Sequence, residues 1–119
     1  MLIDKLYTVK SYDAQSAELR LCAGNVVYQA HFPGMPITPG ACLVQMAAEV
    51  ASLCTAQSLQ LVGIRNAKFI RIVSPTSTPD ILFKMEKTSE NTDGTLLVHC
   101  TFATHEQTLT KLSVCLQKQ

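Results

Sequence analysis

The stretch that decides the fold is HFPGMPITPG, residues 31–40, and it runs directly into the apolar segment ACLVQMAAEVA, residues 41–51. Its three prolines and two glycines exclude regular structure, because proline fixes its own φ and biases the preceding residue towards an extended conformation. We therefore predict a rigid loop that opens a helix, with Thr38 as the cap, Pro39 at the first helical position and Gly40 next. The loop begins with a histidine and ends at a helix start that has free backbone N–H groups. A proton-transfer group and an anion-stabilising group are therefore expected to lie close together.

Length and composition indicate a single domain over residues 1–119. Of these residues 47% are apolar and 16% are charged, which is typical of a globular chain with a real core. The net charge of +1 gives no electrostatic case for nucleic acid or an anionic membrane. Without a bilayer-spanning run or a signal-peptide layout, we expect a cytoplasmic protein. The five cysteines lack paired close spacing, which predicts neither a disulfide framework nor a metal site.

One long helix and several strands are predicted, an α+β arrangement in which a mostly antiparallel sheet curls around the helix. The helix runs from residue 39 to about residue 58 and is apolar almost all round. Its exceptions, Gln45, Glu49 and Ser52, form one polar stripe at i, i+4 and i+7. Either this stripe faces water or a partner subunit, or Gln45 faces the histidine loop. Strands are predicted at residues 7–10, 17–22, 25–30, 61–73, 81–87, 96–104 and 109–116, with turns at 91–94 and 105–107.

Residues 31–40 resemble the active-site loop of the β-hydroxyacyl-acyl-carrier-protein dehydratases of the FabA/FabZ type, whose pattern is roughly H-F-P-G-x-P-x-x-P-G before a central helix. Residues 61–75, LVGIRNAKFIRIVSP, are similar to a second block of that family, G-I-x-x-A-[KR]-F-x-[KR]-x-V-x-P. The resemblance covers about residues 20–117. It implies the hot-dog fold, a long helix wrapped by an antiparallel sheet, usually dimerised so that two sheets run on as one.

The resemblance also implies roles for particular residues. In that family the histidine removes the Cα proton of a β-hydroxyacyl thioester, and the second glycine donates its backbone N–H to the thioester carbonyl. His31 and Gly40 occupy these two positions. A preorganised N–H at a helix N-terminus stabilises an enolate-like oxygen as negative charge develops on it. We expect substrate or carrier contacts from a further set of residues: Tyr28, Phe32, Pro39, Lys68, Phe69 and Arg71.

Two of these expectations have open alternatives. Tyr28 either lines the acyl pocket or only packs. Lys68 and Arg71, three apart on one predicted strand, are placed on opposite faces. They are either solvated charges or groups that dock an acidic carrier protein or the phosphate of its phosphopantetheine. That phosphopantetheine carries the substrate, so no separate cofactor is expected.

The chain departs from the family fourteen residues after His31. There the family has a Glu or Asp, contributed from the other subunit, whereas this chain has Gln45. Glutamine forms hydrogen bonds but cannot deliver a proton at neutral pH. Glu49 stands where many family members carry glutamine. Because one helical turn rises about 5.4 Å, Glu49 would have to act through a water, or serve only as a polar neighbour at the dimer seam.

Three functions remain open. The first, which we favour, is a dehydratase that converts β-hydroxyacyl thioesters of acyl carrier protein to trans-2-enoyl thioesters in fatty-acid or related acyl-chain biosynthesis. The second is a non-catalytic or half-catalytic carrier-binding subunit that pairs with a carboxylate-bearing paralogue. The third is a hot-dog thioesterase, which is weakest because the loop is specific to the dehydratase branch. Expected partners are acyl carrier protein and a second copy, as a homodimer or a multiple of dimers.

Overall fold

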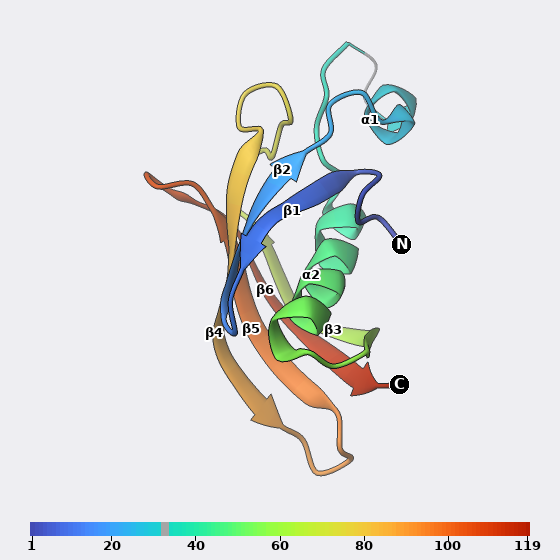
Figure 1. Cartoon of the computed structure of the whole chain (residues 1–119), viewed down its shortest axis with the longest axis vertical. Helices are drawn as coiled ribbons and strands as arrows, with labels where there is room; N and C mark the ends of the chain where they lie inside the picture. The colour runs from blue at the N-terminus through green and yellow to red at the C-terminus, as the bar shows by residue number, and fades with distance from the viewer. Residues whose placement is uncertain (32–33) are drawn as a thin grey trace.

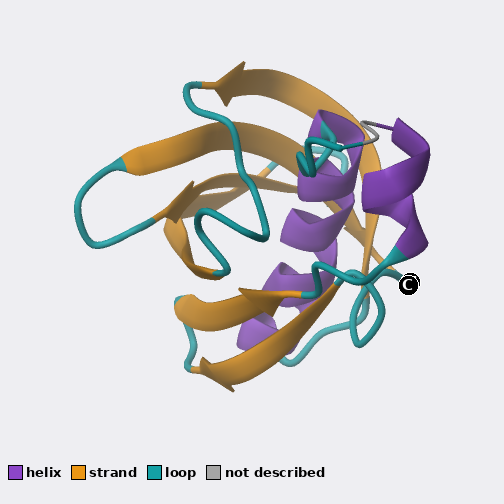
Figure 2. Cartoon of the chain, turned by 90° about the horizontal axis from the view of Figure 1, so that it is seen from above, coloured by secondary structure: helices purple, strands orange, loops and turns teal. Residues whose placement is uncertain are grey.

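The computed structural model describes residues 1–31 and 34–119, and in it a six-stranded antiparallel sheet curls around one long helix (Figure 1). The strand order is β1-β2-β4-β5-β6-β3, so β1 and β3 form the two edges. Viewed from above, the strands curve round α2 (Figure 2). This is the predicted α+β hot-dog arrangement, which is confirmed. The elements are β1 (Tyr7–Tyr12), β2 (Ser16–Leu21), α1 (Val26–His31), α2 (Gly40–Thr55), β3 (Leu59–Phe69), β4 (Asp80–Glu90), β5 (Leu96–Ala103) and β6 (Thr108–Lys118).

The strands bury alternate side chains against the helix, as period-two patterning requires. In β5, Val98, Cys100 and Phe102 are buried while the residues between them are partly exposed. The turn predicted at residues 91–94 joins β4 to β5, and Gly94 takes the positive φ of 88° that glycine tolerates best. The hairpin predicted at residues 105–107 joins β5 to β6. These two local predictions are confirmed.

The long helix predicted from residue 39 to about 58 is α2, and it forms the centre of the core. It buries an apolar face against the sheet, in which Met46 and Val50 are fully inaccessible. The helix ends because Ala56 adopts a left-handed conformation, with its N–H bonded to the Leu53 carbonyl. The helix is therefore shorter at this end than predicted.

Three details differ from the sequence predictions. Residues 25–30, predicted as a strand, lie mostly in α1, because Asn25 caps this helix by accepting the N–H of Val27 at 2.9 Å. Thr38 does not cap α2; the N-cap is Pro39, with no side-chain cap. The strand predicted to residue 73 ends at Phe69, since the N–H groups of the next two residues both donate to the Leu109 carbonyl.

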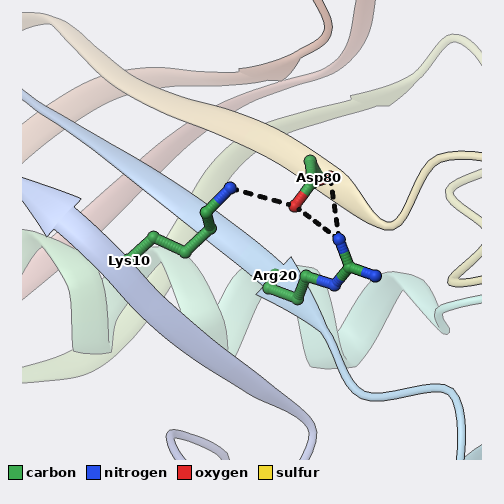
Figure 3. A network of polar contacts seen from close by, with 3 residues as sticks. All are labelled: Lys10, Arg20 and Asp80. Atoms are coloured by element: carbon green, nitrogen blue, oxygen red, sulfur yellow. Dashed lines mark hydrogen bonds and ion pairs between the residues drawn. The ribbon is translucent and has the colours of Figure 1, made fainter.

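Charged side chains join β1, β2 and β4 on the surface. Asp80 accepts hydrogen bonds from Arg20 at 3.0 Å and from Lys10 at 3.4 Å (Figure 3). All three side chains are about half exposed, so these pairs contribute little to stability. Lys10 also places a charge on the β1 edge, which discourages pairing there.

Candidate functional site

The start of α2 presents unpaired backbone donors. The first helical hydrogen bonds are those from the N–H groups of Cys42 and Leu43 to the Pro39 carbonyl. The N–H groups of Gly40 and Ala41 meet no acceptor among the residues that the structure describes. Such orphan donors at the positive end of a helix bind anions and developing negative charge. Of the two residues, Gly40 lines a groove of about 360 Å³, which we call the helix-start groove. The groove is lined by residues 37–40, Leu43 and residues 69–73.

The Phe69 ring approaches Gly40 closely, so a side chain at position 40 would have to displace this ring. A Cβ built on Gly40 would lie 2.7 Å from Cζ of Phe69 and 3.1 Å from two further ring carbons. The Phe69 ring therefore covers the α-carbon of the residue whose N–H is free. Phe69 is half exposed and both residues line the helix-start groove, as does Pro39. The structure thus brings together three of the residues singled out from the sequence.

A hydroxyl pair fastens α1 to the segment before α2. The Tyr28 hydroxyl lies 3.0 Å from Oγ1 of Thr38, and both side chains are buried. Burial raises the pKa of Tyr28 above its ordinary value. Tyr28 lies about one helical turn before His31, and Thr38 lies two residues before Gly40. The contact therefore holds the two ends of the loop at a fixed distance from each other. Of the two alternatives for Tyr28, the structure favours packing, because Tyr28 does not line the helix-start groove.

His31 is the last residue of α1, and its side chain lies outside what the structure describes. Phe32 and Pro33 lie entirely outside the described residues. The roles expected for His31 and Phe32 therefore remain predictions.

Lys68 and Arg71 are both exposed, but they do not share a strand as predicted. Lys68 lies in β3, opposite Lys111 of β6, whereas Arg71 lies beyond the end of β3. The argument from opposite strand faces is therefore wrong. Arg71 lines the helix-start groove and Lys68 does not. Arg71 thus places a positively charged side chain in the groove at the start of α2.

Gln45 and Glu49 line a different groove. It has a volume of about 680 Å³ and lies between the N-terminal segment, α2 and the start of β3; we call it the N-terminal groove. Five residues of helix place Gln45 about 140° round the axis from Gly40 and about 7.5 Å along it. The two grooves share no lining residue. Within one chain, Gln45 and the free N–H donor of Gly40 therefore lie in separate grooves.

Glu49 is a buried carboxylate surrounded by donors. Only 6% of the residue is exposed. It accepts hydrogen bonds from the N–H groups of Leu2 at 2.9 Å and Ile3 at 2.8 Å, from the Tyr7 hydroxyl at 2.9 Å and from Nε2 of Gln45 at 3.0 Å. A buried carboxylate needs such partners, because moving an unpaired ion from water into the protein interior costs roughly several kcal/mol. Burial, then the neighbouring Glu49 carboxylate, raises the pKa of Tyr7 well above its ordinary value.

These contacts change the interpretation of Glu49. A carboxylate offers about four acceptor sites, and four separate donors of this chain already use them. We therefore infer that Glu49 does not substitute for the missing acid. Sequence reasoning missed its partners in the N-terminal segment, and no local signal could have found them, because the contacts span 42 to 47 residues.

The five cysteines are free, and residues 1–31 and 34–119 contain no group of His, Cys, Asp and Glu side chains able to hold a metal ion. Within the same residues, no helix is long and apolar enough to cross a membrane.

Comparison with known proteins decides the family. The ApeI-like family, described as the ApeI dehydratase, matches residues 8–110. The chain belongs to this family. More distant relatives are 3-hydroxyacyl-[acyl-carrier-protein] dehydratases FabZ. That of Latilactobacillus sakei subsp. sakei is 28% identical over 73% of this chain and 67% of its own length. That of Levilactobacillus brevis is 33% identical over 72% and 64%. The chain thus spans about two thirds or less of the curated relatives it matches.

A solved structure shares the fold of this ApeI-like chain. It is described as the Dehydratase Heterocomplex ApeI:P from Xenorhabdus doucetiae. It superimposes with a TM-score of 0.59 over 87% of this chain and 88% of the other, at 19% sequence identity. At that identity the likeness supports the hot-dog fold alone.

Proposed function

We propose that this chain binds a β-hydroxyacyl thioester, carried on the phosphopantetheine of an acyl carrier protein, and dehydrates it to the trans-2-enoyl thioester. The observation that carries the proposal is the unpaired N–H group of Gly40, a residue that lines the helix-start groove. Arg71 lines the same groove and supplies a cation for the phosphate of the carrier arm. The family membership supports the same chemistry.

The reaction follows from these groups. His31 takes the Cα proton, and the electron pair moves onto the thioester oxygen. The Gly40 N–H stabilises that oxygen, and one such donor is typically worth about 3 kcal/mol of barrier. The electrons then return to form the Cα–Cβ double bond, the Cβ–O bond breaks, and the hydroxide leaves with a proton as water. Gln45 cannot supply that proton, so in this proposal a water supplies it, and the hydroxide formed from that water takes back the proton held by His31, which restores both groups.

The complete site is proposed to form between two chains, because Gln45 and Gly40 lie in two separate grooves of one chain. Strand β3 is a free sheet edge, and exposed apolar side chains gather on it and on the segment that follows: Val62, Ile64, Phe69, Ile70 and Ile72. An apolar edge of this kind is normally covered by another strand. We propose a cytoplasmic dimer paired along β3, with Gln45 of one chain near His31 of the other.

A heterodimer is the second candidate, and Gln45 is the observation that favours it. A partner with a carboxylate at this position would supply the acid that this chain lacks, while this chain supplies His31 and Gly40. The likeness to the ApeI:P heterocomplex supports the idea that such pairs exist on this fold.

The deciding experiment is an assay for loss of water from β-hydroxyacyl carrier protein, read by mass spectrometry across chain lengths. The purified protein is tested alone and after mixing with a co-encoded carboxylate-bearing paralogue. Turnover by the protein alone supports the dehydratase. Turnover only in the mixture supports the half-catalytic subunit. No turnover in either contradicts both, and release of free acid would point to a thioesterase.

The proposed dimer edge gives one testable result. Replacing both Val62 and Ile64 by lysine is expected to weaken the dimer at least tenfold, because each exposed branched side chain gains about 1.5–3 kcal/mol when fully buried. Sedimentation velocity over a dilution series measures the change. Val26→Lys is the matched control, since Val26 is an exposed apolar residue of α1, away from β3. An unchanged dimer in the double variant would place the interface elsewhere.

A second prediction concerns the missing acid. Gln45→Glu is expected to raise kcat at least tenfold with little change in KM, since a general acid is typically worth about 10²–10⁴ in rate. The new carboxyl would face the Glu49 carboxylate, and repulsion between two like charges favours a proton on the new side chain, which keeps an acid available. The double exchange Gln45→Glu with Glu49→Gln restores the family's order and is the companion variant. No gain in either variant would contradict a role in proton delivery for position 45.

A further inference from the structure

The exchange of Gln45 and Glu49 has a geometric consequence for the ligand. Nε2 of Gln45 donates to Oε2 of Glu49 at 3.0 Å. We propose that Glu49 is a positioning residue that fixes the Gln45 amide with its nitrogen turned to the carboxylate, so that Oε1 is presented to the N-terminal groove as the acceptor for a ligand hydroxyl. This inference rests on the proposed function and specifies what position 45 recognises.

The orientation of the amide follows from the acceptor-only character of a carboxylate. If the amide were rotated by 180°, Oε1 would lie against Oε2 of Glu49, and two acceptors would meet without a proton between them. A charge-assisted hydrogen bond would be replaced by repulsion. Nε2 keeps a second hydrogen, but its nitrogen is held at Glu49, so Oε1 is the free end of the side chain.

Glu49 itself is fixed, which makes it a rigid support. Its two oxygens are held by the N–H groups of Leu2 and Ile3 and by the Tyr7 hydroxyl, all between 2.8 and 3.1 Å. Glu49 and Tyr7 are buried and the other partners are partly buried, so the carboxylate cannot turn away without leaving these donors unpaired. The same carboxylate thus fixes both the orientation of the Gln45 amide and the position of the N-terminal segment that lines the groove.

The presented group determines the chemistry that fits it. Gln45 is half-buried and lines the N-terminal groove together with Met1 and Ile3. Its Oε1 meets no donor among the residues that the structure describes. An acceptor at this place binds an O–H group and repels a carbonyl oxygen. The site is therefore expected to prefer 3-hydroxyacyl chains over 3-oxoacyl and saturated chains of the same length.

Binding of unreactive ligands tests this selectivity. Pantetheine amides of a 3-hydroxyacyl, a 3-oxoacyl and a saturated chain of equal length are compared by calorimetry. For the unaltered protein we expect the 3-hydroxy ligand to bind about fivefold to tenfold more tightly than the saturated one. Gln45→Met, which keeps the length of the side chain, is expected to abolish the preference. Glu49→Gln is expected to reduce it at least twofold while leaving the affinity for the saturated ligand unchanged, because a glutamine can offer Gln45 either a donor or an acceptor.

Gln57→Met is the matched control, since Gln57 lines the same groove in an exposed position beyond the end of α2. It is expected to keep the full preference. A second measurement does not depend on any variant folding. Hydrogen exchange of side-chain amides by NMR is expected to be slower for Gln45 than for Gln57.

Each outcome is decisive. A full preference in Glu49→Gln, with only a lower melting temperature, would reduce Glu49 to a structural role and overturn the inference. Equal preference in Gln45→Met and the unaltered protein, or equal amide exchange at Gln45 and Gln57, would do the same. If the unaltered protein binds none of the three ligands, the proposed thioester site fails, which is a different result from binding all three without preference.

Discussion

His31→Ala is expected to lower the rate of dehydration, and of the reverse hydration of the enoyl thioester, by about a hundredfold or more. Removal of the Cα proton needs a base, and His31 is the histidine at the mouth of the loop between α1 and α2. The fold should be unaffected, because the loop ends are fixed by the Tyr28–Thr38 hydroxyl pair and by the N–H of Thr38, which donates to the Val73 carbonyl at 2.7 Å.

The measurement is steady-state turnover of a β-hydroxyacyl thioester together with a thermal unfolding curve. His105→Ala is the control, since His105 is exposed in the hairpin between β5 and β6. Activity within tenfold of the unaltered protein, with normal unfolding, would remove His31 from the mechanism.

Glu49→Leu is expected to lower the free energy of unfolding by about 2–4 kcal/mol, because each buried donor left unpaired costs about 1–3 kcal/mol. The variant removes the acceptor of the Leu2 and Ile3 N–H groups and of the Tyr7 hydroxyl. Detachment of the N-terminal segment would let water reach these donors, but it would also expose Leu6 and Tyr7, which are fully buried. Because exposing these two side chains to water is itself unfavourable, the variant loses unfolding free energy even if the segment detaches.

Urea denaturation monitored by circular dichroism measures this loss. Glu49→Gln is the comparison, because it keeps the shape of the side chain and one acceptor oxygen, and it should lose less than half as much stability as the leucine variant. A loss below about 1 kcal/mol for Glu49→Leu would mean that the carboxylate's bonds merely offset its cost of burial.

Much of the fold was predictable because its signals are local. The irregular segment at residues 34–39, the apolar helix and the hairpin turn around Gly94 each depend on neighbours in sequence, whereas the part of the predicted loop at residues 32–33 lies outside the described residues. The prediction of a strand at residues 25–30 was wrong, because the Asn25 side chain accepts the N–H of Val27 and starts helix α1 there. The early end of β3 was not predictable, since it depends on a carbonyl of β6 that accepts two hydrogen bonds.

The candidate site was predictable only in part. Sequence reasoning identified Gln45, Glu49 and Ser52 as a polar stripe and singled out Gly40 and Phe69. It did not show that the Glu49 carboxylate accepts hydrogen bonds from the first residues of the chain. It also did not show that Gln45 and Gly40 line separate grooves. Both facts depend on tertiary contacts over long sequence distances, which a motif does not encode.

The contact between Phe69 and Gly40 joins the end of the edge strand β3 to the start of α2. Phe69 ends the free edge strand, and its ring rests on a backbone with no Cβ to cushion it. If β3 pairs with a strand of a second chain, as proposed, the Phe69 ring connects that pairing edge to the N–H donor of Gly40. We therefore expect tighter association to hold this donor more firmly, and to raise any activity that depends on it, even when every reacting group is unchanged.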